Sequence, residues 1–141
     1  MRVLGLDVGT RRIGVALSDA LGLTAQGLTV LERSTMAQDV EAVCKVIGEQ
    51  GVEAVVVGWP LALSGKPGPQ APRVEAFVQA LRRRVGMPIA LLDERFTTAQ
   101  GERVLLEADV SRRRRKQLVD QLAAQLILQQ YLEQERVRRD R

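Results

Sequence analysis

The chain has 141 residues, of which 45% are hydrophobic and 27% are charged. This length and this balance are typical of one soluble globular domain, so we expect a single domain over residues 1–141 with a basic helical tail over about 133–141. No apolar stretch reaches the roughly 18 residues of a membrane span. Asp7 comes too early for a signal peptide, and a single cysteine, Cys44, excludes an internal disulfide. Together these features predict a cytoplasmic protein.

The sequence contains no histidine. This excludes a Ser-His-Asp triad, a Cys-His dyad, a histidine general base and most zinc enzymes. Any hydrolytic chemistry would have to come from carboxylates, hydroxyls, lysine or arginine, or from hard metal ions bound by oxygen atoms.

The basic residues are concentrated near the C-terminus. Residues 1–110 hold 12 basic and 13 acidic side chains, whereas residues 111–141 hold 9 basic and 4 acidic ones. The excess begins with the run RRRRK at 112–116. Such clustering fits a polyanionic partner such as nucleic acid. The alternative is a solvated, partly disordered basic stretch.

The hydrophobic pattern alternates between short apolar runs and helical periodicity. The apolar runs predict strands over 3–8, 13–18, 24–31, 52–58 and 88–92. Helical spacing predicts helices from Thr35 to Gly51, over 71–85, from Thr97, and from about 117 to 135, with a long loop over 59–70.

The order of these elements predicts a mixed α/β fold. Residues 9–12 are short enough to close an antiparallel hairpin, and the third strand follows another short turn. The fourth and fifth strands each follow a crossover helix, so we expect each of them to run parallel to a neighbour.

Three acidic residues break apolar patterns. Asp7 interrupts the first strand, Glu94 follows the buried run 89–92, and Asp120 falls at the edge of the apolar face of the last helix, beside two alanines. Two carboxylates ~4 Å apart repel by ~4 kcal/mol at an effective dielectric of ~20, so three converging acids need cations. Oxygen ligands alone select Mg²⁺ or Mn²⁺.

Each acid also has a separate explanation. Asp7 would be a turn residue, Glu94 would pair with Arg95, and Asp120 would bond to a hydroxyl or an arginine. The joint site therefore depends on convergence of all three acids. An arginine head group between them would count against it.

Neighbouring residues provide further expectations. Asp19 should lie at the far end of the first hairpin from Asp7, and Asp93 should point to the opposite side of its strand from Glu94. In the last helix, Leu128 and Leu132 fall toward the otherwise polar side, where they would pack against a partner or a tail.

Four blocks of the sequence come in a specific order and span nearly the whole chain. They are DVGTRRIGVALSD (7–19), VVGWPL (56–61) with GPQ (68–70), LDERFTT (92–98), and DQLAA (120–124) continuing as ILQQYL (127–132). This ordered set resembles the YqgF/RuvX family of pre-16S rRNA nucleases, also described as Holliday junction resolvases. The family more often has a smaller apolar residue where this chain has Trp59.

The resemblance implies a ribonuclease H-like α/β fold, with a five-stranded mixed sheet flanked by helices. It carries the family's acidic site onto Asp7, Glu94 and Asp120, and it implies hydrolysis of phosphodiester bonds with two Mg²⁺ or Mn²⁺ ions. The candidates for contact with nucleic acid are Thr10, Arg11, Arg12, Arg95 and Lys116. Only four residues are aromatic, so base stacking is not expected to dominate, and Trp59 fits stacking and core packing equally well.

Several functions remain open on the sequence alone. The expected partner is structured RNA, with pre-16S rRNA placed first by the resemblance, or branched DNA in junction resolution. The protein would act as a monomer or a homodimer. A non-catalytic RNA-binding module is a third possibility. A sugar kinase or actin-like phosphotransferase shares the DxGT motif, but it needs two such domains.

Overall fold

The computed structural model describes residues 1–60, 68–93 and 112–140, and of residues 112–118 it describes only the helical backbone. The strands are β1 (Val3–Val8), β2 (Arg12–Ser18), β3 (Ala25–Glu32), β4 (Ala54–Trp59) and β5 (Ile89–Asp93). The helices are α1 (Met36–Gln50), α2 (Ala71–Arg82) and α4 (Arg112–Arg139). The helix predicted from Thr97 and most of the loop predicted over 59–70 lie outside the described residues.

The five strands form one mixed sheet in the order β3-β2-β1-β4-β5. β2 is antiparallel to both β1 and β3, whereas β4 is parallel to both β1 and β5. The predicted architecture of three antiparallel strands followed by two parallel ones is therefore confirmed.

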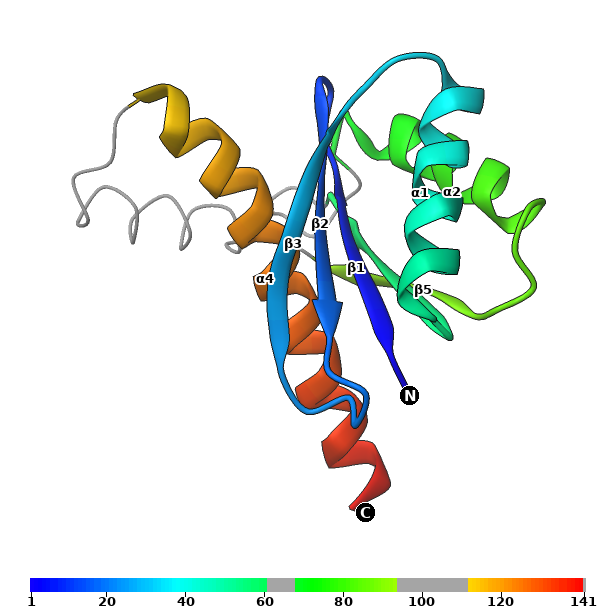
Figure 1. Cartoon of the computed structure of the whole chain (residues 1–141), viewed down its shortest axis with the longest axis vertical. Coiled ribbons are helices and arrows are strands. Elements are labelled where there is room, and N and C mark those ends of the chain that lie inside the picture. The colour runs from blue at the N-terminus through cyan, green and yellow to red at the C-terminus, as the bar shows by residue number, and fades with distance from the viewer. Residues whose placement is uncertain (61–67, 94–111, 141) are drawn as a thin grey trace.

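The helices cover both faces of this sheet, with α4 on one side and α1 and α2 on the other (Figure 1). Side chains alternate between the faces along each strand. In β1, Leu4 and Leu6 belong to the core under α1 and α2, whereas Val3 belongs to the core under α4. The same alternation places Asp7 on the α4 side of the sheet.

Helix α1 forms as its sequence predicts. The hydroxyl of Thr35 accepts a hydrogen bond from the Gln38 backbone N–H at 3.1 Å, and Gly51 ends the helix in the left-handed conformation with a φ of 65°. The Gln38 side chain accepts from the Ser34 hydroxyl instead of completing a capping box with Thr35.

The predicted start of the last helix was wrong, and the helix continues past its predicted end near 135 into the stretch expected as a basic helical tail. Helix α4 begins at Arg112, so the basic run 112–116 lies inside it rather than before it, and the helix continues to Arg139. Arginine and lysine have high helix propensity, and the arginines in the last turn interact favourably with the helix dipole. A run of basic residues therefore does not interrupt a helix.

The interpretation of Leu128 and Leu132 as residues on the polar side was also wrong. They are 0% and 5% exposed and pack in the core under α4. Helix α4 contacts four strands of the sheet, and such a broad contact buries a wide apolar stripe that includes both leucines.

Two glycines allow α4 to lie directly on the sheet, and a third gives room to one of its side chains. A Cβ atom on Gly14 would lie 2.0 Å from the Asp120 carbonyl oxygen, and one on Gly5 would lie 2.7 Å from Leu128 Cβ. A Cβ atom on Gly27 would lie 2.6 Å from Cγ of a glutamine in α4. The absence of a side chain at Gly5 in β1 and Gly14 in β2 therefore sets the depth of the helix.

A glutamine stripe on α4 fixes the helix along β3. Gln125 Nε2 donates to the Ala25 carbonyl at 3.2 Å, and Gln129 Oε1 accepts from the Ala25 N–H at 3.1 Å. The polar stripe therefore holds the helix in register on the sheet. None of the helices in the described ranges has the length and apolar character that a membrane crossing requires.

We predict that Gly14→Ala destabilises the protein by about 1–3 kcal/mol, because the new methyl group would meet the backbone of α4 and not a movable side chain. Gly48→Ala is the matched control. Gly48 lies within α1 with nothing within 4 Å of its Cβ position, so alanine should stabilise the protein by about 0.5–1 kcal/mol. Urea unfolding measures both variants, and equal stabilities would contradict the close-contact argument.

Candidate active site

Asp7 is half-buried near the end of β1, and its partner across the antiparallel pair is Gly14. Directly opposed residues in such a pair lie about 4.5–5.5 Å apart and project to the same face. The face is the α4 side, where the Asp120 carbonyl lies directly over Gly14. Asp7 and Asp120 are therefore neighbours on one face of the sheet. Gly14 makes this juxtaposition possible.

An arginine from the same hairpin contacts the second acid. Arg12 Nε donates to Asp120 Oδ2 at 2.6 Å, with side chains that are 24% and 26% exposed. This hydrogen bond raises the pKa of Arg12, and the desolvation of the guanidinium opposes the shift. The pair joins β2 to α4 across 108 positions of the chain. It matches the alternative reading in which an arginine accounts for Asp120.

The third predicted acid, Glu94, lies outside the described residues, as do Arg95 and the side chain of Lys116. Leu92 packs in the core under α4, so alternation along β5 puts Asp93 on the opposite face. Among the residues that the structure describes, no three acidic, histidine or cysteine side chains form a group that could hold a metal ion. The complete three-acid site stays a prediction.

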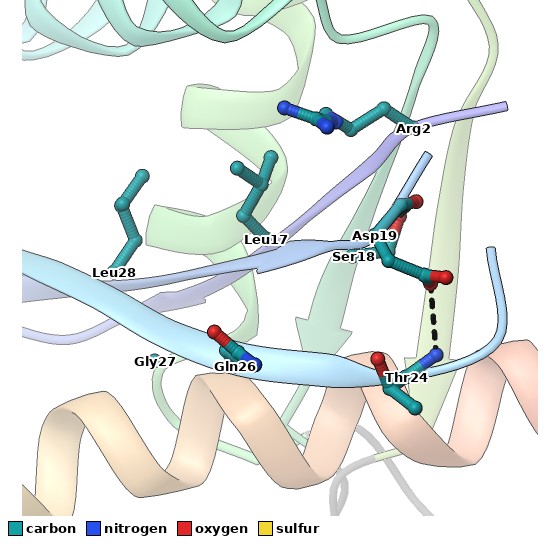
Figure 2. Close-up of a pocket in the computed structure, with 8 residues that line it drawn as sticks. All are labelled: Arg2, Leu17, Ser18, Asp19, Thr24, Gln26, Gly27 and Leu28. Carbon is teal, nitrogen blue, oxygen red and sulfur yellow. Dashed lines mark hydrogen bonds between the residues drawn. The ribbon is translucent and has the colours of Figure 1, made fainter. Parts of the chain in front are cut away.

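Asp19 lies at the opposite end of the hairpin, as expected. Its carboxylate accepts hydrogen bonds from the backbone N–H groups of Leu23 at 2.7 Å and Thr24 at 3.0 Å. Both hydrogen bonds lower the pKa of Asp19, and the bond from Thr24 has the larger effect. The residue also lines a cavity of about 260 Å³ beside the start of β3 (Figure 2), which neither Asp7 nor Asp120 lines. Asp19 therefore serves the β2–β3 turn.

A buried ion pair that the sequence analysis missed supports the β1–β2 turn. Asp39 is 4% exposed and accepts from Arg33 Nε at 3.1 Å and from the Ser34 backbone N–H at 2.8 Å. Arg33 Nη1 donates to the Gly9 carbonyl at 3.0 Å. A signal was present, since Asp39 precedes Val43 by four residues and so falls on the apolar face of its helix.

A second missed contact reaches the same turn from α2. Arg73 Nη1 donates to Thr10 Oγ1 at 3.3 Å, and both residues are exposed. Periodicity gives no signal for this contact, because Arg73 lies on the polar face of its helix like any solvated arginine. Trp59, by contrast, packs against the core under α1 and α2, which favours the core reading over base stacking.

A sheet of three antiparallel strands that continue into two parallel ones, with the long helix α4 across one face, is the architecture of a ribonuclease H-like protein. The model of one family, described as "RuvX: Holliday junction resolvase", matches residues 1–134. The chain therefore belongs to the RuvX family, a family of nucleases and hence of hydrolases that act on ester bonds.

Relatives match over nearly the whole chain. A protein of Moorella thermoacetica named "Putative pre-16S rRNA nuclease" is 55% identical over 133 residues, covering 94% of this chain and 95% of that protein. A protein of Desulforudis audaxviator with the same name is 50% identical over 132 residues, covering 94% of each chain. RuvC of T. thermophilus, solved with a Holliday junction substrate, is similar in fold, with a TM-score of 0.59, 18% identity and 96% of each chain covered.

We predict that Arg33→Gln destabilises the protein by about 3 kcal/mol, because it leaves the buried Asp39 carboxylate without its cation. Lys45→Gln is the matched control. It breaks an exposed pair with Glu49 on α1 and should cost less than about 0.5 kcal/mol. Urea unfolding gives the free energies, and equal losses would show that the Arg33 pair does not support the turn.

Proposed function

We propose that this chain is a metal-dependent endonuclease that hydrolyses phosphodiester bonds in structured RNA, during 5′-end processing of pre-16S rRNA in the cytoplasm. The observation that carries the proposal is the juxtaposition of Asp7 and Asp120 across Gly14, at the end of the first hairpin. The relatives named for pre-16S rRNA support RNA as the substrate. The family description supports branched DNA as the second candidate.

The described side chains fit a divalent cation. Carboxylate oxygens are hard ligands, of the kind that Mg²⁺ and Mn²⁺ prefer. Arg12 contacts Oδ2 of Asp120, but a carboxylate offers two oxygens and about four lone-pair directions. Asp7 and Asp120, with Glu94 as the resemblance implies, would hold the metal, and two ions are expected. When bound, such ions supply an activated water and stabilise the leaving oxygen.

The other candidate residues would position the substrate. Thr10 and Arg11 are exposed in the turn that follows Asp7, and Arg12 lies beside the acids. Guanidinium groups bind phosphate through paired N–H donors, so these side chains would hold the backbone of a strand without reading its sequence. Arg95 and Lys116 complete the proposed set of contacts.

The Arg12–Asp120 pair leads to a prediction for metal binding. Arg12 and a cation share one carboxylate, so Arg12→Gln should tighten Mn²⁺ binding by about fivefold, the equivalent of an ion pair worth ~1 kcal/mol. Arg11→Gln removes the same charge from the neighbouring exposed position and should change the affinity by less than about twofold. Electron paramagnetic resonance of free Mn²⁺ measures binding directly. Equal affinities of the two variants would contradict competition at Asp120.

The catalytic assignment predicts that Asp7→Asn lowers cleavage by about 10²-fold or more, because it removes one negative ligand from the site. Asp19→Asn makes the same chemical change at the other end of the hairpin and should leave the rate unchanged. The substrates are a pre-16S rRNA fragment and a four-way DNA junction, each with Mg²⁺ or Mn²⁺.

The outcomes of this experiment separate the candidate functions. Equal cleavage by Asp7→Asn and wild type would end the catalytic role of Asp7. Cleavage of the junction alone would favour resolution of branched DNA. Binding of RNA without cleavage by the wild-type protein would favour a non-catalytic RNA-binding module.

A further inference from the structure

The β1–β2 turn lies between two sides of the sheet that carry different charged residues. Asp7, Arg12 and Asp120 gather on the side covered by α4. Arg73 belongs to the first turn of α2, which covers the opposite side. The turn lies between them, because Thr10 receives the hydrogen bond from Arg73 while Arg12 at the other end of the turn reaches Asp120.

The arginines around this turn differ in how their charge is used. Arg33 holds the Gly9 carbonyl, and its charge is balanced by the buried Asp39. Arg11 and Arg73 are exposed, and neither forms an ion pair within the described residues. The contact with Thr10 occupies one of the five N–H donors of Arg73.

A guanidinium beside a hydroxyl is a chemical match for a phosphate diester. The guanidinium offers parallel N–H donors and a permanent positive charge, and the hydroxyl adds one further donor. If Arg73 only supported the turn, this contact would add little stability, because it is a single long hydrogen bond between two exposed side chains. The backbone of the turn is already held by Arg33.

We propose that Arg73 and Thr10 form a phosphate-binding site for a nucleic-acid strand that crosses the end of the sheet, from the acids on the α4 side to the first turn of α2. This inference rests on the proposed function, since the strand is the substrate of the acidic site. It assigns a role to Arg73 and a direction to the substrate path.

The test measures binding in EDTA, so that no cleavage occurs. The probes are an end-labelled four-way DNA junction and an end-labelled RNA hairpin, and the affinity is measured as a function of salt. Arg73→Gln should bind about three- to tenfold more weakly and lower the slope of log K against log salt by about 0.9 on duplex or 0.7 on single strand. Arg83→Gln, at the exposed far end of the same helix, should retain both the affinity and the slope. Arg73→Lys should retain most of the slope.

A second measurement locates the contact. In a series of DNA junctions that each carry one uncharged methylphosphonate, one position should weaken the wild type but not Arg73→Gln, because the variant has already lost that contact. Arg83→Gln should respond as the wild type does. Urea unfolding shows that each variant is folded.

The result that would overturn the inference is a slope for Arg73→Gln equal to those of wild type and Arg83→Gln, or a loss of affinity spread evenly over all phosphates. Either result leaves the proposed function intact if the wild-type protein still cleaves with Mg²⁺. If wild type binds neither probe, the inference fails together with the proposed function. If Asp7→Asn cleaves as well as wild type while Arg73→Gln has lost its contact with one phosphate of the DNA junction, only the catalytic assignment fails.

Discussion

The contact between α4 and the first hairpin depends on Gly14, because any side chain there would overlap the Asp120 carbonyl. The helix can lie at this depth only because the strand beneath it has no side chain at this position, and the same applies at Gly5. Packing of this kind places a residue near the N-terminal end of the chain beside one 113 positions later. The placement of Asp7 and Asp120 on one face of the sheet therefore follows from close packing.

Much of the fold could be predicted from the sequence because its signals are local. Apolar runs marked the five strands, and Thr35 and Gly51 marked the ends of α1. The start of α4 was not predicted, because the basic run was placed before the helix although arginine and lysine have high helix propensity. The burial of Leu128 and Leu132 could not be predicted, because it depends on how broadly the helix contacts the sheet. That breadth depends on small residues in strands that are distant in sequence.

The candidate site also has a part that could be predicted from local sequence patterns and a part that could not. Asp7 and Asp120 stand out because each breaks an apolar pattern, and the structure brings them to one face. An arginine was one predicted alternative partner of Asp120, but the sequence does not indicate which arginine, since Arg12 meets Asp120 across 108 positions. The nearby contact of Arg73 with Thr10, across 63 positions, was not predicted. Hydrogen-bond partners at such separations are determined by topology. Periodicity within one element carries no information about them.

The glutamine contacts of α4 also affect how the protein behaves among its own copies. β3 is a terminal strand of the sheet, and unpaired peptide groups on such a strand invite pairing with another chain. At Ala25, however, both the N–H and the carbonyl are bonded to glutamine side chains of α4. An incoming strand would have to displace two amide groups to extend the sheet at this point. The helix that places Asp120 on the same face as Asp7 therefore also protects the start of this edge from intermolecular β-pairing.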